Sequence, residues 1–354
     1  MVIDRSCLLR PWSGRGLAGR GSGEQYLQRN GLQNREWTDL LTMSNDRYLY
    51  GPVPSRRLGR SLGIDLVPHK VCTYDCVYCQ VGKTTERTLQ RKEYVPTEEV
   101  LEEVRNFLSG GSASIDHFSL SGSGEPTLHS QIGSIIKGMK GMSSVPVAVL
   151  TNGSLLYLEE VKDDLRQADI ILPSLDAVSK EIFTRINRPH KGISVEKVIE
   201  GLVEFRKVYR GQIWLEILFC KGMNDGESEL LHMKKAVDRI QPDLIHLNTV
   251  VRPPVDPRAA PLNSEEMEKI QALFGERASI ISEFDRHPLS LPEVNVKEEI
   301  FRILRRRPLS LIDLSQRMTI SKKELEATIQ PMVDEGKIKT RRLGDLVYYE
   351  VPKS

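Results

Sequence analysis

The chain has 354 residues, 39% of them hydrophobic and 28% charged, which excludes a disulfide-stapled mini-protein and a mainly disordered chain. Its 50 basic and 48 acidic side chains leave a net charge of +2, so charge alone indicates no polyanionic partner. No run approaches the roughly 18 apolar residues of a membrane span. Five cysteines are too few for a disulfide framework in a chain of this length. We therefore expect a cytoplasmic protein, with no membrane association, that folds as one large and one smaller domain.

Residues 1–47 are predicted to form a disordered N-terminal extension. The first 42 residues are rich in Gly and Arg and show neither helical nor strand periodicity. Two origins remain open: a natural flexible arm, or an upstream start that precedes a natural first residue at Met43. The acidic residues Asp4 and Glu24 weaken an interpretation as an organellar targeting peptide.

Residues 48–290 alternate β-rich runs with helical patterns, which is typical of a parallel sheet with helical crossovers. The pattern predicts an α/β fold, a partial (β/α)6 TIM-like barrel, whose chemistry lies at the carboxyl ends of the strands. Strands are expected near positions 62, 117, 145, 169, 213 and 244. Helices are expected over 97–109, 155–167, 179–186, 194–209, 226–240 and 264–274.

Residues 291–354 follow a different pattern and predict a small C-terminal winged-helix domain. Helices are expected over 294–307 and 310–318, and a third begins at the capping box of Ser321 and Glu324. Pro331 is expected to kink or shorten this third helix. Two alternating strands around Gly344-Asp345 predict a closing hairpin.

Cys72, Cys76 and Cys79 form a C-TYD-C-VY-C cluster on the loop that leaves the first predicted strand. Three thiolates from one tight loop can hold three corners of a 4Fe-4S cluster and leave the fourth iron open for chemistry. The alternative is a zinc site with His69 as the fourth ligand, although zinc sites usually pair their ligands in two separated turns.

Further motifs follow at successive predicted strand ends: SGSGEPTL from 121, TNGSLL from 151, PSLDA from 173 and EILFCKGMND from 216. Together with CxxxCxxC and the aromatic Tyr78 before its third cysteine, they resemble the radical S-adenosylmethionine (radical SAM) superfamily over about residues 50–260. The run GPVPSRRLGRSLGIDLVP resembles the branch of iron-sulfur oxidoreductases related to wyosine synthesis. One departure is Ser123, which stands where the family has Gly.

The resemblance implies two cofactors, a 4Fe-4S cluster on Cys72, Cys76 and Cys79, and S-adenosylmethionine (SAM) bound beside it. It places Gly124, Glu125 and Pro126 at the methionine amino group. It also places the remaining cofactor contacts: Tyr78 at the adenine, Thr151 and Asn152 near the cofactor, Ser174 and Asp176 at the ribose or the methionine carboxylate, and Asn224 in the fifth-strand loop.

The resemblance also implies a reaction, in which SAM is cleaved reductively and a 5′-deoxyadenosyl radical abstracts hydrogen from a substrate. Such an enzyme needs an electron donor such as flavodoxin or ferredoxin. The substrate remains open, and an RNA base, a peptide and a small metabolite are all compatible with the sequence. A second hypothesis is a redox-sensing regulator that uses its iron-sulfur cluster as the sensor and binds nucleic acid through the winged helix.

Several further side chains have both a functional and a purely structural interpretation. Arg56, Arg57 and Arg60 either form a solvated loop or bind an anion, such as the cofactor carboxylate or a substrate phosphate. His246 and Asn248 either line the cavity or lie hydrogen-bonded in the core.

Other candidates lie outside these motifs. Cys220 is expected to be a small buried hydrophobe rather than a hydrogen donor or an extra cluster ligand. The run 188–190 either ends a helix or caps the active-site mouth. Arg305–Arg307, with Arg341 and Arg342, either reach nucleic-acid phosphates or form a solvated face.

Overall fold

The computed structural model describes residues 48–110, 115–281, 296–318 and 320–352, all within one compact unit, 46–354. The predicted N-terminal extension 1–47 and the predicted domain boundary at 290–291 lie outside these residues. The division into two domains therefore stays a prediction. Among the described residues, every helix is too short or too polar to cross a lipid bilayer.

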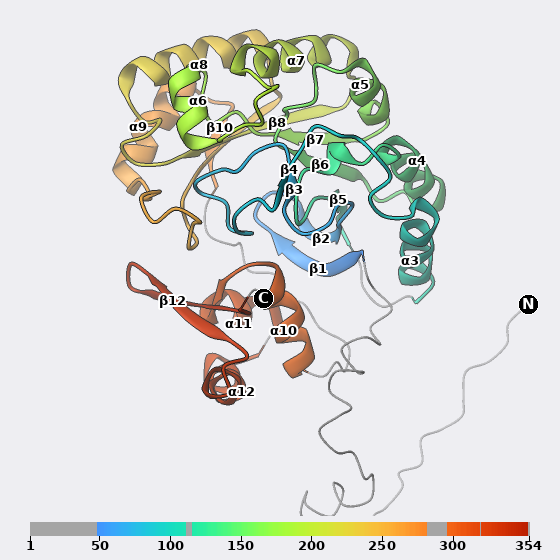
Figure 1. Cartoon of the computed structure of the whole chain (residues 1–354), viewed down its shortest axis with the longest axis vertical. Coiled ribbons are helices and arrows are strands. Elements are labelled where there is room, and N and C mark those ends of the chain that lie inside the picture. The colour runs from blue at the N-terminus through green and yellow to red at the C-terminus, as the bar shows by residue number, and fades with distance from the viewer. Residues whose placement is uncertain (1–47, 111–114, 282–295, 319, 353–354) are drawn as a thin grey trace, which may run out of the picture. The chain divides into compact units, whose positions relative to one another are not determined.

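An eight-stranded sheet organises residues 49–280 (Figure 1). All neighbouring strands are parallel except β1, which runs antiparallel to β2 at one edge. In sheet order the strands are β1 (Leu49–Ser55), β2 (Gly59–Ile64), β5 (His117–Leu120), β6 (Val147–Thr151), β7 (Ile170–Pro173), β8 (Gln212–Phe219), β9 (Leu244–Thr249) and β10 (Ala278–Ile280). The six predicted strands are confirmed, and the two edge strands, β1 and β10, were not predicted.

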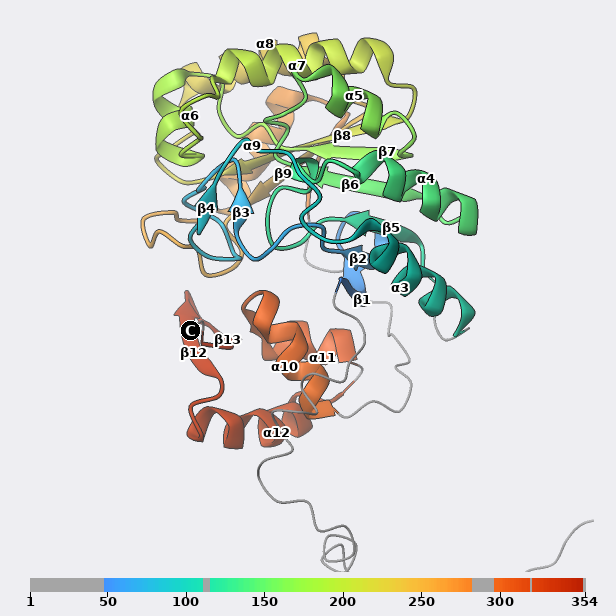
Figure 2. The same ribbon diagram turned by 45° about the vertical axis from the view of Figure 1, so that its right-hand side comes forward.

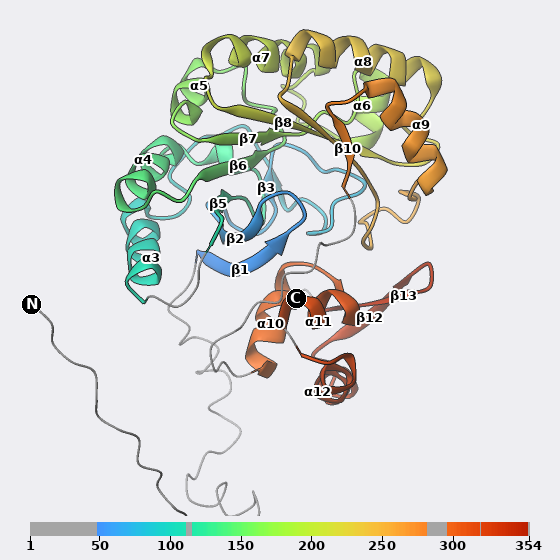
Figure 3. The same ribbon diagram turned by 180° about the vertical axis from the view of Figure 1, so that it is seen from behind.

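Helices cover the convex face of this sheet, as Figures 1 and 3 show from opposite sides. They are α3 (Thr97–Ser109), α4 (Ile132–Met142), α5 (Glu159–Leu165), α6 (Lys180–Ile186), α7 (Val195–Val208), α8 (Glu227–Ile240) and α9 (Ser264–Phe274). All were predicted except α4, although α5 is shorter at both ends than expected. The mixed α/β fold with a parallel sheet is thereby confirmed.

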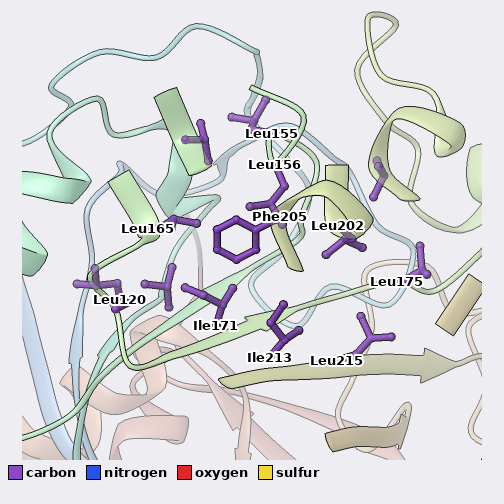
Figure 4. Close-up of a cluster of buried hydrophobic side chains, with 14 of the residues drawn as sticks. Leu120, Leu155, Leu156, Leu165, Ile171, Leu175, Leu202, Phe205, Ile213 and Leu215 are labelled. Atoms are coloured by element: carbon purple, nitrogen blue, oxygen red, sulfur yellow. The ribbon is translucent and has the colours of Figure 1, made fainter. Parts of the chain in front are cut away.

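The core lies between the sheet and these helices. Figure 4 shows Leu156 and Phe205 on the helix side, facing Ile171 and Ile213 of the sheet, and all four side chains are fully buried. Each contributes about 1.5–3 kcal/mol by leaving water. Because strand side chains alternate between faces, Leu172 instead joins a smaller apolar cluster on the concave face.

The C-terminal residues form three helices and a small antiparallel sheet (Figure 2). The elements are α10 (Val296–Arg306), β11 (Leu309–Ser310), α11 (Leu311–Met318), α12 (Lys322–Asp334), β12 (Lys339–Leu343) and β13 (Leu346–Glu350). The three helices and the two-residue hairpin at Gly344-Asp345 agree with prediction. Assignment to the winged-helix class stays a prediction.

Pro331 does not shorten the third helix, because α12 continues past it to Asp334. Ile329 and Met332 on either side of the proline are buried in the small core of this region. Their burial keeps the helix continuous despite the backbone N–H that proline lacks. The capping residue is as predicted, since the Ser321 hydroxyl accepts a hydrogen bond from the Glu324 N–H at 3.2 Å.

Candidate active site

The cysteine loop follows β2, and the short strand β3 (Val71–Cys72) holds its first thiol next to β4 (Glu86–Arg87). Cys72, Cys76 and Cys79 are half-buried free thiols. Each sulfur has a hydrogen-bond donor beside it: the Tyr74 N–H is 3.5 Å from Cys72 Sγ, Asn187 Nδ2 is 3.6 Å from Cys76 Sγ, and Lys70 Nζ is 3.1 Å from Cys79 Sγ. Such donors stabilise thiolates and therefore suit an anionic cluster.

Burial governs the protonation of these thiols. It raises the pKa of Cys72 to about 11, with a further increase from Glu125, and raises the pKa of Cys76 well above the usual value. Both thiols are therefore protonated at neutral pH until metal displaces the protons. Burial alone would lower the pKa of Lys70, but the sulfur atoms of Cys79 and Cys72 outweigh it, so that the pKa is raised. Lys70 thus places a positive charge beside the loop.

The donor set fits a 4Fe-4S cluster better than a single zinc ion. Within the described part of the chain, no three Cys, His, Asp or Glu side chains lie close enough to hold one metal ion. Three cysteines from one loop are a typical donor set for three corners of a 4Fe-4S cluster. His69, the fourth ligand of the zinc alternative, is exposed.

One side of the loop is hydrogen-bonded to the SGSGEP segment after β5. The Lys70 N–H donates to the Ser123 carbonyl at 2.7 Å, and the Glu125 N–H donates to the Val71 carbonyl at 3.1 Å. This close approach requires a glycine at 124, because a Cβ there would lie 1.9 Å from the Val71 oxygen. The predicted Gly124 therefore has a clear steric role beside Cys72.

The other side of the loop is hydrogen-bonded to the segment Ile186–His190, which follows α6. Three backbone bonds join them: Val77 N–H to the Ile186 carbonyl at 2.9 Å, Asp75 N–H to the Asn187 carbonyl at 3.0 Å, and His190 N–H to the Thr73 carbonyl at 2.8 Å. The run 188–190 therefore ends a helix, as one interpretation expected, and also braces the cysteine loop.

Glu125 is 2% exposed and holds the ends of β5 and β6 together. Its Oε1 accepts from the Thr127 N–H, the Thr127 hydroxyl and the Thr151 hydroxyl at 3.0, 2.5 and 2.6 Å. Its Oε2 accepts from the Asn152 N–H at 2.7 Å. Each carboxylate oxygen has two lone pairs, so Oε2, which accepts one bond, has room for one further donor. Burial raises the pKa of Glu125, and these hydrogen bonds oppose that rise.

Asn152 connects this carboxylate to the cysteine loop. Its Nδ2 donates to the Thr73 hydroxyl at 2.7 Å and lies 3.6 Å from Cys72 Sγ. On the neighbouring strand, Ser174, which directly follows β7, donates its N–H to the Thr151 carbonyl at 3.0 Å. The predicted residues Thr151, Asn152 and Ser174 are thus adjacent at the carboxyl edge. Pro126 opens the short helix η1 (Pro126–Leu128) beside them.

Asp176 forms a second buried carboxylate centre after β7. Its Oδ2 accepts from the Tyr78 hydroxyl and from Asn187 Nδ2, the latter at 2.8 Å, and its Oδ1 accepts from the Leu218 N–H at 3.0 Å. Burial and the charge of Asp176 raise the pKa of Tyr78 well above its usual value. The two predicted residues Tyr78 and Asp176 are therefore in direct contact, next to Cys76.

Asn224 has a structural position. The residue is 0% exposed, and its Nδ2 donates to the carbonyls of Asp176 and Leu218 at 2.8 Å each. Its Oδ1 accepts from the Cys220 N–H at 2.8 Å. Both Nδ2 hydrogens and the Oδ1 of Asn224 bond to backbone groups around the β8 loop, so this geometry does not favour the predicted direct contact with a cofactor.

The remaining candidates separate into two groups. On the concave face, Arg57 forms an ion pair with Glu216, whose Oε1 also accepts from Asn248 Nδ2 at 3.2 Å, and His246 is buried beside them. Arg60 instead pairs with Asp116 in a half-exposed position, which agrees with the solvated-loop interpretation.

Cys220 is fully buried in a small apolar cluster, as expected for a hydrophobe, and burial raises its thiol pKa to about 12. Sequence reasoning missed three residues: Lys70, just before β3, Asn187, just after α6, and Thr73, which lies within the cysteine loop and bonds to Asn152. Lys70 and Thr73 lie within two positions of Cys72, whereas Asn187 carried no local signal.

Comparison with known proteins gives this site a family. Residues 66–233 match the family model of the radical SAM superfamily. The chain is 32% identical over 306 residues to a UPF0026 protein of Methanocaldococcus jannaschii, covering 85% of this chain and 94% of that protein. The chain is also 34% identical over 329 residues to a protein named GTPase Obg of Brachyspira hyodysenteriae. This match covers 90% of the chain but only 47% of that protein.

Among solved structures, that of TYW1 with a lysine-pyruvate adduct bound matches with a TM-score of 0.47 and 18% identity, covering 73% of this chain and 90% of TYW1. The matched range 66–233 of the family model contains the cysteine loop and the motifs at the strand ends. The chain therefore belongs to the radical SAM superfamily of iron-sulfur enzymes, whose members use a 4Fe-4S cluster and SAM.

Proposed function

We propose that the chain cleaves SAM reductively and uses the resulting 5′-deoxyadenosyl radical to abstract hydrogen from a substrate. Cys72, Cys76 and Cys79 would hold a 4Fe-4S cluster, which supplies the electron for this cleavage when bound. The observation that carries the proposal is the convergence of three donor-flanked free thiols with the nearly saturated carboxylate of Glu125 at one edge of the sheet.

Glu125 is proposed to accept a hydrogen bond from the methionine ammonium of SAM. Its Oε2 has a remaining acceptor site, and a charge-assisted bond to an ammonium is stronger than a neutral one. Thr151 and Asn152 orient the carboxylate through the bonds described above. Gly124 and Pro126 shape the backbone that carries it past the cysteine loop.

Asp176 is proposed to position the adenosyl end of SAM together with Ser174 and Tyr78. The tyrosine ring lies within the cysteine loop, and its hydroxyl is fixed on Asp176. This arrangement fits a contact with the ribose through the polar groups and with the adenine through the ring. Asn224 is proposed to act indirectly, because its Nδ2 donates to the Asp176 carbonyl and so fixes the backbone that carries this carboxylate.

Radical SAM enzymes need an electron donor and a substrate. We propose a flavodoxin or a ferredoxin as the donor. The cysteine loop and the strand-end motifs serve the shared SAM chemistry rather than substrate choice.

The test is anaerobic reconstitution with iron and sulfide, followed by dithionite and SAM, with 5′-deoxyadenosine measured by chromatography. Wild type and Cys220→Ala should form the product, whereas Cys76→Ala should lose both the brown colour and the product. Cys220 is the matched control because it is a free thiol outside the loop. A colourless wild type that binds one zinc per chain would reject the proposal.

The C-terminal region is proposed to be a winged helix that serves the barrel. Its support is the element order of helix, strand, two helices and hairpin. The contacts of two of its arginines do not favour a nucleic-acid-binding face: Arg341 donates to the Pro254 carbonyl at 2.7 Å, and Arg305 lies over the Phe301 ring at 5.1 Å. The comparisons lend no support to the regulator hypothesis.

A further inference from the structure

A cavity of about 290 Å³ lies between the cysteine loop and the C-terminal region. Its wall includes Cys79, one of the three proposed cluster ligands, followed along the chain by Gln80, Gly82 and Lys83. Arg252 Nη1 donates to Gln80 Oε1 at 3.0 Å and so ties this part of the loop to the segment after β9. Among the described residues that line the cavity, none is proposed to contact SAM. The cavity therefore reaches the cysteine loop at a place that the SAM chemistry leaves free.

The C-terminal region supplies the other wall of this cavity. Two hydrogen bonds join it to the segment after β9: Arg341 Nη2 donates to the Pro254 carbonyl at 2.7 Å, and the Tyr348 hydroxyl donates to the Val251 carbonyl at 2.9 Å. Strands β12 and β13 carry the two donors, and Arg341 and Pro254 both line the cavity. The cavity is therefore built by both parts of the fold, and neither part forms it alone.

The charged residues of the lining are mainly basic. Lys83, Lys339 and Arg341 carry positive charge, and Glu350 is the acidic residue among the described residues of the lining. Lys83 and Lys339 are exposed, and within the described part of the chain no carboxylate pairs with either ammonium group. Unpaired exposed cations attract an acidic surface over about a Debye length, roughly 8 Å at physiological salt. The opening of the cavity thus favours a negatively charged partner.

The remaining walls of the cavity are apolar and rigid. They consist of prolines and valines from the segment after β9 and from the C-terminal region: Pro253, Pro254, Val255, Pro308, Val351 and Pro352. Proline has no backbone N–H and a fixed ring, so these walls offer few hydrogen-bond donors and little freedom to rearrange. A hollow with apolar walls and exposed cations suits a flat apolar group that projects from an acidic protein surface.

We propose that this cavity is the docking site of the electron donor, an acidic flavodoxin-type protein, and that the C-terminal region forms half of that site. The edge of the flavin ring rests against the proline walls beside Cys79, and the acidic surface around it faces Lys83 and Lys339. The inference rests on the proposed function, because reductive cleavage of SAM needs a donor. The reduced flavin loses one electron and the oxidised cluster gains it, with no covalent bond formed or broken. Electron-transfer encounters need only a small interface, and charge complementarity sets their rate.

The first experiment measures binding of an acidic flavodoxin to the reconstituted protein by isothermal titration calorimetry, at low and at high ionic strength. Lys83→Glu and Lys339→Glu should each weaken binding by about five- to tenfold at low ionic strength and by less at high ionic strength. Lys339→Arg keeps the charge and should bind like wild type. Lys137→Glu is the matched control, because Lys137 is an exposed lysine of α4 outside the cavity, and no described carboxylate pairs with it. Arg341 is kept, since it holds the cavity together.

The second experiment measures 5′-deoxyadenosine formation with two reductants. With limiting reduced flavodoxin, Lys83→Glu and Lys339→Glu should form the product about five- to tenfold more slowly than wild type and Lys137→Glu. With excess dithionite, a small ion that needs no protein docking surface, all four proteins should form it at the same rate. Equal slowing of the two cavity variants with both reductants overturns the docking role, because the defect would then lie in the SAM site.

The other outcomes also decide the proposal. Equal flavodoxin binding by wild type and both cavity variants overturns it, and so does weakening by Lys83→Glu alone, because the C-terminal region would then take no part. Binding of a ferredoxin but not of a flavodoxin overturns the assignment of the cavity to a flavin edge. Formation of 5′-deoxyadenosine with dithionite but without any flavodoxin binding leaves the proposed function intact and refutes this inference. Flavodoxin binding that both cavity variants weaken, without 5′-deoxyadenosine from either reductant, supports the docking site and refutes the proposed function.

Discussion

Gly124→Ala tests whether the close approach of the SGSGEP segment positions the cysteine loop. The added Cβ would lie 1.9 Å from the Val71 carbonyl oxygen, whereas ordinary contacts begin at 3.4 Å. The backbone must therefore separate by about 1.5 Å, in the residue just before Cys72. Overpacking costs about 1–3 kcal/mol, and the lower chain entropy of alanine returns about 0.4–1 kcal/mol. We expect a net loss of about 1–2 kcal/mol.

The assay compares urea unfolding of the apoprotein with the iron content after reconstitution. Gly124→Ala should shift the unfolding midpoint downward and bind less iron, because its strain acts on the loop. The control is Gly141→Ala, an exposed position in α4 with nothing within 4 Å of the new Cβ. That change should stabilise the fold by up to about 1 kcal/mol and leave iron content unchanged. Wild-type stability and iron content in Gly124→Ala would refute the steric argument.

Three further perturbations have expected outcomes. Lys70→Gln should lower the midpoint potential of the cluster by on the order of 60 mV in an EPR-monitored titration. The positive charge of Lys70 stabilises the reduced cluster, which is the more negative state, and the substitution removes about 1.4 kcal/mol of that stabilisation. Asn224→Ala should cost at least ~3 kcal/mol in urea unfolding, because three buried backbone groups lose their partner. Burial and the charge of Arg57 lower the pKa of His246 from 6.5 to about 4. Between pH 6.5 and 4 the unfolded chain therefore binds more protons than the folded chain. Apoprotein stability should fall by about 3 kcal/mol from pH 6.5 to 4, and His246→Phe should flatten this slope.

Each of these has a control and a contradicting result. Lys70→Arg keeps the charge and should keep the potential, and an unchanged potential in Lys70→Gln would contradict the electrostatic role. An Asn224→Ala protein of normal stability that fails to bind SAM would restore the direct cofactor contact. A wild-type stability that does not depend on pH between 6.5 and 4 would contradict the buried neutral state of His246.

The sequence predicted those parts of the fold that have strong local patterns. Strand runs such as Ile170–Pro173 are continuously apolar, and helices such as α7 combine spacing with a serine cap at Ser194. Helix α4 was missed because its three glycines lower helix propensity. Its apolar residues Ile132, Ile135, Ile136 and Met139 are buried against the core, and this tertiary contact outweighs the local preference.

The same division holds for the site. Motifs close in sequence, such as the cysteine loop and Gly124-Glu125, were visible because their spacing is local. Asn187 lies 111 positions from Cys76, and Arg252 lies 172 positions from Gln80. Contacts over such separations depend on how the strands assemble, so no local pattern signals them.

The cysteine loop is fixed by backbone hydrogen bonds on both flanks, to the residues around Ser123 and to those around Asn187. None of these bonds involves a sulfur ligand. The cysteine loop can therefore stay folded in the iron-free chain, unlike a zinc finger, which unfolds without its metal. Under iron shortage the protein would then accumulate as folded, inactive apoprotein. A cluster carrier could activate it again without new protein synthesis.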